Sequence, residues 1–355
     1  MVFRSMFDIC TRRRTHVIAI AFGVIFLVGE CFSNLALSIE YSAAPSPGSR
    51  VLKSITPLEC QPNCSCSDVW IVSTRGLPGI CEFPDRANFT VERLRECGRW
   101  EKSNLPSLLE NPNQPIHIFV HGNRYESGDA KSQGAFFARQ MTAACPESSS
   151  VRTVIFSWPS AQQGILLKDG RAKYNRCFSD GHYLAHLLGF MEPQRPVALM
   201  GYSFGALIIL EGLSELVELE QNEALRPSMQ PWTHRSARTH MVLVAAAVRC
   251  DAFSPRGPYR GALQCVDRLV LINNSRDDAL KHFPKLDPCM RIEAMGYAGM
   301  RDAWFLPSSL EYTATDASNI IGRHHGLPLY LSSSSLTRRI ASGALEGLDV
   351  VKVLP

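Results

Sequence analysis

The chain of 355 residues is 45% hydrophobic and 20% charged, which is ordinary for a globular protein. Its length is enough for one domain with a large core, with or without an appendage. The formal net charge is +4, and residues 1–38 hold four arginines against two acidic residues. The remainder of the chain is therefore nearly neutral and has no basic stripe. This excludes nucleic acid as an expected partner.

Residues 1–38 form the first predicted element, a leader for export. Three arginines at positions 12–14 precede the apolar run at 17–29. That run of about 13 residues is shorter than the roughly 20 that a membrane-spanning helix needs, and it suits the apolar region of a secretory signal. We therefore expect a periplasmic or extracellular protein. The alternative is an uncleaved N-terminal anchor, and membrane contact is expected only through this leader.

Residues 39–66 are predicted to be a linker and the start of a Cys-rich N-terminal extension. Residues 41–50 are rich in proline, serine and glycine. In an oxidising compartment, closely spaced cysteines are expected to pair as disulfides, whose connectivity the sequence leaves open. The alternative, a metal knot, has a spacing that fits no common zinc pattern, so no metal site is expected. The cysteines of this stretch are Cys60, Cys64, Cys66, Cys81 and Cys97.

Residues 67–335 alternate strand-like runs with helical patterns and are predicted to form one α/β domain. Several runs are continuously apolar, as expected for strands covered on both faces, so we predict a mostly parallel sheet with helices on both faces. Residues 336–355 are expected to be a C-terminal helix or tail. The predicted strands are 69–75, 116–122, 151–160, 197–203, 241–248 and 267–274, and the predicted helices are 130–144, 180–190 and 206–219.

A serine bracketed by two glycines, in Gly201-Tyr202-Ser203-Phe204-Gly205, lies between a predicted strand and a predicted helix. This G-x-S-x-G pattern is typical of a nucleophile elbow, where a tight turn lifts the serine oxygen off the end of the sheet. The same turn aims the backbone N–H of Phe204 at a developing oxyanion. The alternative is a simple strand–helix turn.

An elbow needs a second oxyanion donor, which comes from the loop after an earlier strand. His121-Gly122-Asn123 ends such a strand, and the backbone N–H of Asn123 is the expected donor. Tyr202, His121 and Tyr125 are candidates for contact with substrate, with ordinary core packing as the alternative.

The base should be a histidine held by a carboxylate, in the chain order Ser…Asp…His. Asp277, Asp278 and Asp251 follow predicted strands downstream of the elbow and are the candidate acids. His324 and His325 are the histidines near the C-terminus, and one of them is the expected base.

These motifs together resemble a family of bacterial alpha/beta hydrolases of unknown function. The resemblance rests on "IHIFVHGNRYESGDA", "VIFSWPSA", "GYSFGALIIL", "VLVAAAVRCDAF" and "INNSRDDAL…MGYAGM". It implies an alpha/beta-hydrolase domain over 67–335, with a doubly wound sheet and an esterase- or lipase-like triad. It places the nucleophile at Ser203 and prefers Asp277 over Asp278 as the acid. The final histidine is a pair in this sequence, so the choice between His324 and His325 stays open, with His325 as our preference. The elbow departs from the family, with Tyr-Ser-Phe where members commonly show His-Ser-Met.

The sequence thus predicts an exported serine hydrolase that cleaves a carboxylic ester of a small molecule or a lipid through an acyl-enzyme. No metal or organic cofactor is expected. One alternative is a catalytically silent binding protein with a hydrolase-like fold. Another is a peptidase or thioesterase that uses the same triad.

Overall fold

The computed structural model describes residues 68–146, 150–233, 235–286 and 291–349. The predicted leader, the linker and Cys60, Cys64 and Cys66 therefore lie outside the described residues. The disulfides predicted for the Cys-rich stretch stay a prediction. In the part of the chain that the structure describes, no helix is both long enough and apolar enough to span a membrane.

One sheet organises the described residues, with the strand order β3-β2-β1-β5-β4-β6-β7-β8-β9. The strands from β4 onward and β1 run parallel, while β2 and β3 add antiparallel strands at one edge. The strand bounds are β1 (Val69–Ser73), β2 (Thr90–Leu94), β3 (Trp100–Ser103), β4 (Ile116–Val120), β5 (Arg152–Ser157), β6 (Val197–Tyr202), β7 (Thr239–Val244), β8 (Arg268–Asn273) and β9 (Glu311–Asp316).

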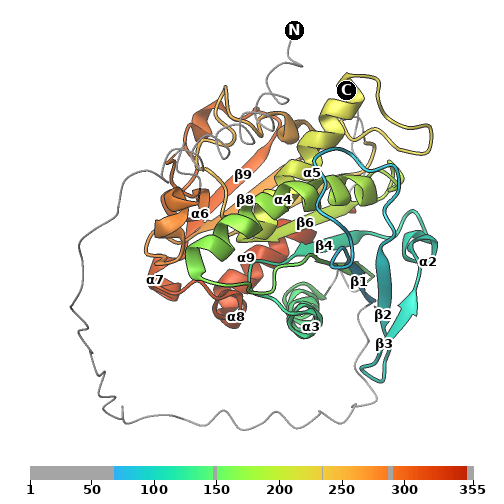
Figure 1. Ribbon diagram of the computed structural model, residues 1–355, viewed down its shortest axis with the longest axis horizontal. Helices are drawn as coiled ribbons and strands as arrows, with labels where there is room; N and C mark the ends of the chain where they lie inside the picture. Colours follow the sequence, from blue (N-terminus) through green and yellow to red (C-terminus); the bar gives the residue numbers. More distant parts are fainter. Residues whose placement is uncertain (1–67, 147–149, 234, 287–290, 350–355) are drawn as a thin grey trace, which may run out of the picture. The chain divides into compact units, whose positions relative to one another are not determined.

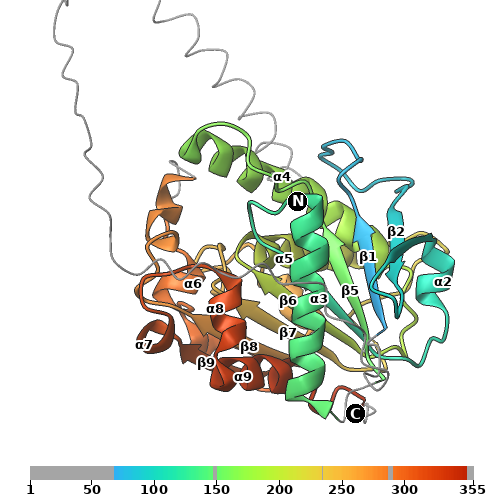
Figure 2. The same ribbon diagram turned by 90° about the horizontal axis from the view of Figure 1, so that it is seen from below.

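Helices cover both faces of the sheet (Figure 1). Helices α4 and α5 pack together on one face, and α3 and α9 pack on the other, as both views show (Figures 1 and 2). The bounds are α2 (Leu105–Leu109), α3 (Ser127–Ala144), α4 (Leu166–Leu188), α5 (Phe204–Gln221), α6 (Met295–Ala298), α7 (Ser318–Ile321), α8 (Leu327–Ser332) and α9 (Ser334–Leu345), with short 3-10 helices η2 (Gly261–Cys265), η3 (Leu280–Lys285) and η4 (Ala303–Phe305).

The central strands explain why the sequence folds in this way. Every residue of β4, β5, β6 and β7 is buried, which matches their continuous apolar runs. The mostly parallel sheet with helices on both faces, predicted from those runs, is confirmed. The helix expected in the C-terminal region begins at Ser334, and its buried side chains, such as Ile340, pack against β7 and β8.

The register of the sheet brings the ends of several strands together. Val120, the last residue of β4, pairs with Gly201 of β6, and Asn273, the last of β8, pairs with Asp316 of β9. The carboxyl ends of parallel strands lie at one edge of a sheet, where α/β proteins place their sites. The segments that follow β4, β6, β8 and β9 therefore meet at this edge.

Candidate active site

Ser203 occupies a strained turn between β6 and α5. Its φ of 55° and ψ of −119° are unfavourable for a residue with a side chain. A Cβ on Gly201 would lie 2.6 Å from the Cα of Ala206, and one on Gly205 would lie 2.0 Å from the carbonyl oxygen of Val120. The two glycines are therefore required by backbone atoms that cannot move aside. Ser203 is 5% exposed, less open than the elbow pattern predicted.

Three side chains from separate segments form a hydrogen-bonded chain at this turn. His325 Nε2 lies 2.9 Å from Ser203 Oγ, and His325 Nδ1 lies 2.7 Å from Oδ2 of Asp277. Asp277 is fully buried, and its Oδ1 accepts the backbone N–H groups of Ala279 and Leu280, each at 2.9 Å. These two bonds fix the plane of the carboxylate, so that its other oxygen points at the imidazole.

The loop that carries His325 is held by two side chains, one at the end of β6 and one just after β8. The hydroxyl of Tyr202 donates to the carbonyl oxygen of His325 at 2.5 Å. The amide of Asn274, which is fully buried, donates to the carbonyl oxygens of Gly322 and His324, both at 3.0 Å. Sequence reasoning assigned no role to Asn274, although its place at the end of β8 was a signal.

The other candidate acids and base lie away from the serine. His324 is exposed to solvent. Asp278 is exposed and forms an ion pair of 2.9 Å with Arg323. Asp251 pairs with Arg249 at 2.5 Å. Only Asp277 and His325 of these candidates are brought into the hydrogen-bonded chain with Ser203.

The two expected oxyanion donors lie beside the serine. Phe204 is the first residue of α5, so its N–H has no partner in a preceding turn. A Cβ on Gly122 would lie 3.1 Å from the Cβ of Ser203, which places the backbone at Gly122-Asn123 against the nucleophile. Within the described residues, the N–H groups of Phe204 and Asn123 have no backbone acceptor.

The three aromatic residues that are candidates for substrate contact are all buried, as is Ser203. Tyr202 is 4% exposed, and its hydroxyl donates to the loop that carries His325. The hydroxyl of Tyr125 donates to Gln133 at 2.8 Å. His121 stacks on Tyr125 and Trp158, and burial lowers its pKa to about 3, so the ring is neutral. The rings of His121 and Tyr125, in the segment after β4, thus stack on each other inside the domain.

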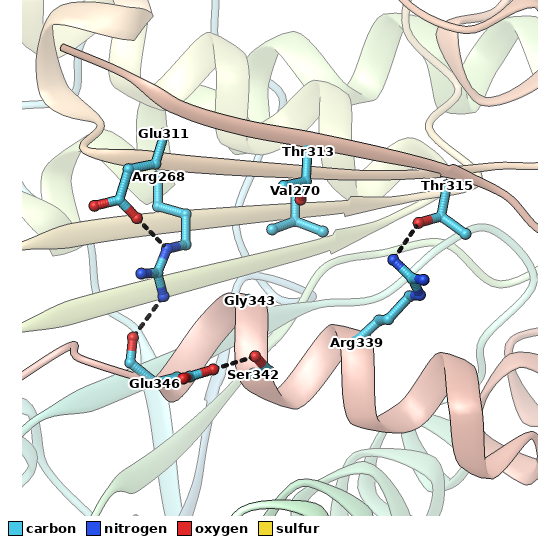
Figure 3. Close-up of a pocket in the computed structure, with 9 residues that line it drawn as sticks. All are labelled: Arg268, Val270, Glu311, Thr313, Thr315, Arg339, Ser342, Gly343 and Glu346. Atoms are coloured by element: carbon cyan, nitrogen blue, oxygen red, sulfur yellow. Dashed lines mark hydrogen bonds and ion pairs between the residues drawn. The ribbon is translucent and has the colours of Figure 1, made fainter.

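A separate pocket of about 360 Å³ lies between α9 and strands β8 and β9 (Figure 3). Arg268 and Arg339 stand at its two ends, with Val270 between them. Arg268 pairs with Glu311 at 2.7 Å, and none of the candidate site residues lines this pocket. Its lining residues include no histidine or cysteine.

Comparisons with known proteins give one matching family and several similar solved structures. A family model described as an alpha/beta hydrolase of unknown function (DUF900) matches residues 100–288. No curated protein matches the chain. Similar solved structures include esterase B from Lactobacillus rhamnosis (12% identity, TM-score 0.34, covering 75% of this chain and 84% of that one). A serine hydrolase without a lid from Xanthomonas campestris has 14% identity and a TM-score of 0.31, covering 68% and 85%. The catalytic core of an acetyl xylan esterase from Trichoderma reesei has 15% identity and a TM-score of 0.32, covering 68% and 100%.

Proposed function

We propose, from the premise that this chain belongs to the family of alpha/beta hydrolases of unknown function, that it hydrolyses carboxylic esters through an acyl-enzyme. One observation carries the proposal. His325 stands within hydrogen-bond distance of both Ser203 and Asp277, so the serine has a base and the base has an orienting carboxylate. This is the arrangement that activates a serine hydroxyl for attack on a carbonyl.

In the first step, Ser203 Oγ forms a bond to the ester carbonyl carbon while His325 Nε2 takes the hydroxyl proton. Asp277 keeps the proton on Nδ1 and stabilises the imidazolium that forms. The carbonyl oxygen becomes an oxyanion and accepts hydrogen bonds from the N–H groups of Phe204 and Asn123, each worth about 3–4 kcal/mol of barrier. When the bond between the carbonyl carbon and the alcohol oxygen breaks, Nε2 gives the proton to the leaving alkoxide.

In the second step, water attacks the acyl-enzyme. His325 takes a proton from the water, and a second oxyanion forms in the same place. The bond from the carbonyl carbon to Ser203 Oγ then breaks, Nε2 protonates the serine oxygen, and the carboxylic acid leaves. No step in this cycle calls for a redox partner.

The strained serine also favours an enzyme over a silent binding protein. A residue with a side chain at φ 55° and ψ −119° costs of order 1–3 kcal/mol, and such strain persists at functional sites. A binding module has no need of that geometry or of a base within reach of the hydroxyl. The same triad could act on peptides or thioesters, so the bond that is cleaved must be tested directly.

The test is hydrolysis of p-nitrophenyl esters of increasing chain length, by the wild-type chain and by Ser203→Ala. We expect Ser203→Ala to lower kcat by about 10⁴-fold or more. Ser335→Ala, at an exposed serine, should keep the wild-type rate. Parallel assays with a thioester and a peptide anilide report on the other two bonds. A chain that cleaves one of those and no ester would contradict the proposal.

We also propose that the hydrolase acts outside the cytoplasm. Support for this comes from the arginines and the apolar run in residues 1–38 alone. Cell fractionation of the full chain, compared with a chain in which the arginines at 12–14 are replaced by glutamate, tests it. Equal amounts of both proteins in the cytoplasmic fraction would contradict export.

A further inference from the structure

Several exposed apolar side chains lie on segments that flank the candidate active site. Ile165 is 80% exposed and Leu167 is 41% exposed, at the N-terminal end of α4. Ile320 in α7 is 54% exposed, and Leu329 in α8 is 44% exposed. Single exposed hydrophobic residues are normal, but a group of them beside one site indicates an interaction surface.

These segments all leave the sheet at the edge where Ser203 lies. The N-terminal part of α4 follows β5, and α7 and α8 follow β9 on either side of His325. The ring of Tyr174 in α4 lies 6.4 Å from that of Phe204, beside the elbow. Arg171 of α4 donates to the carbonyl oxygen of Lys285 in η3 at 3.1 Å. This hydrogen bond joins the segment after β8 to α4. Figure 2 shows α4, α6, α7 and α8 around this end of the domain.

The exposed charges of these segments are almost all positive. We define the rim as the described residues at 161–173, 274–286 and 318–329. Its exposed acidic side chain is Asp278, which is paired with Arg323. The rim holds seven lysines and arginines against three aspartates, and its net charge of +4 equals the formal net charge of the whole chain. The rest of the chain therefore has no such excess. The exposed basic residues of the rim are Lys168, Arg171, Arg276, Lys281, Lys285 and Arg323.

We propose that the rim docks on an anionic lipid surface and that the substrate is an ester carried in that surface. This inference rests on the proposed ester hydrolysis and names its substrate class. Charge complementarity selects the occupant: lysine and arginine side chains are attracted to anionic headgroups, and the apolar side chains between them enter the interface. Ser203 lies at the strand edge from which the rim segments leave, so a lipid surface bound to the rim would stand at the same end of the domain as the proposed nucleophile.

The test compares one ester presented in two kinds of vesicle. Vesicles of phosphatidylglycerol or of phosphatidylcholine carry a long-chain p-nitrophenyl ester, and soluble p-nitrophenyl butyrate reports on the intact site. We expect the full chain to hydrolyse the ester faster in phosphatidylglycerol vesicles, and high salt to reduce that preference. Residues 1–67 are present in every protein compared, so any contribution they make is common to all.

Two double variants test the apolar side chains and the basic side chains of the rim separately. Ile165→Ser with Leu167→Ser should lower the rate on phosphatidylglycerol vesicles about tenfold or more. Lys168→Gln with Lys281→Gln should lower it about fivefold for each charge removed. Trp304→Ser is the matched control, because Trp304 is 77% exposed but lies outside the rim, on the connection that enters β9.

The outcomes distinguish this inference from the proposed function. All variants should hydrolyse soluble butyrate at the wild-type rate, which also shows that they fold. If butyrate is hydrolysed but the rim variants act on vesicles as Trp304→Ser does, or if both lipids give equal rates, lipid docking is wrong and ester hydrolysis stands. If wild-type protein hydrolyses no butyrate, the proposed function itself is wrong.

Discussion

The hydroxyl of Tyr202 donates a hydrogen bond of 2.5 Å to the carbonyl oxygen of His325, and the two rings lie 5.3 Å apart. Tyr202 is the residue before the nucleophile, so the elbow itself holds the backbone of the proposed base. A Cβ on Gly122 would lie 2.8 Å from the ring of Tyr202, so the oxyanion loop packs on the same side chain. One buried tyrosine thus contacts the segments of the proposed nucleophile, the proposed base and the proposed oxyanion donor, and we assign it a positioning role.

Replacing this hydroxyl should weaken turnover more than binding. Tyr202→Phe keeps the ring but leaves the carbonyl of His325 without its donor, which costs about 1–3 kcal/mol when the group is buried. We expect kcat to fall about tenfold with KM nearly unchanged, because the imidazole is less well held. Steady-state kinetics on a p-nitrophenyl ester measure this. A rise in KM with constant kcat would instead support a role in substrate contact.

The two adjacent aspartates should differ sharply in their effect on the rate. Asp277→Asn keeps the shape of the side chain but removes the charge that orients His325, and we expect kcat to fall by about 10⁴-fold. Asp278→Asn removes only an exposed ion pair with Arg323 and should stay within about twofold. Kinetics of the two variants side by side check the assignment of the acid. Similar losses in both would show that it is wrong.

The glycine after the nucleophile should tolerate no side chain. In Gly205→Ala the new Cβ would meet the carbonyl oxygen of Val120, a backbone atom, at 2.0 Å. We expect the free energy of unfolding to fall by about 3 kcal/mol or more and activity to be lost. Gly261→Ala is the matched control, since its nearest atom would lie 3.7 Å away. Urea unfolding of both variants, with equal midpoints as the contradicting outcome, tests the geometry of the elbow.

Glu211 gives the protein a stability that depends on pH. Burial raises its pKa from 4.5 to about 7, with Glu215 and Glu218 adding to the rise and Tyr259 and His182 opposing it. The tyrosine hydroxyl donates to the Glu211 side chain. In the folded protein the carboxyl therefore holds its proton at a pH where the unfolded chain has released it.

The sign of this effect follows from proton linkage. Because the folded state binds the extra proton, stability is fully present below pH 4.5 and is lost as pH rises through about 7. The loss is about 3 kcal/mol at most. Glu211→Gln should flatten that slope, and we expect it to be more stable than wild type at pH 8. Urea midpoints at pH 5 and pH 8 measure the slope; an unchanged slope in the variant would rule out Glu211 as its source.

Much of the architecture could be predicted from the sequence because the parallel strands are continuously apolar. The mostly parallel sheet expected from those runs is confirmed, and so is the alpha/beta-hydrolase fold that the family resemblance implies. β9 was not predicted, since its sequence EYTATD is polar and mostly exposed at the edge of the sheet. The β2–β3 hairpin was missed for a similar reason, because both strands are short and contain charged side chains. Only pairing with neighbouring strands makes these segments extended.

The candidate site could be predicted only in part from the sequence. The G-x-S-x-G motif and the order of acid and base name residues that the fold brings together. They could not choose between His324 and His325, because that choice depends on which side chain the loop turns inward. Nor could they show that Tyr202 and Asn274 hold this loop, since both contacts join residues far apart in the chain.

The central claim is that His325 activates Ser203, and the most direct measurement is the rate and position of fluorophosphonate labelling. Intact mass and peptide mapping should find one adduct, on Ser203, in wild type and in His324→Ala. In His325→Ala we expect labelling to be at least about a hundredfold slower, because the hydroxyl has lost its base. Labelling of His325→Ala at the wild-type rate, or an adduct on another residue, would contradict the mechanism.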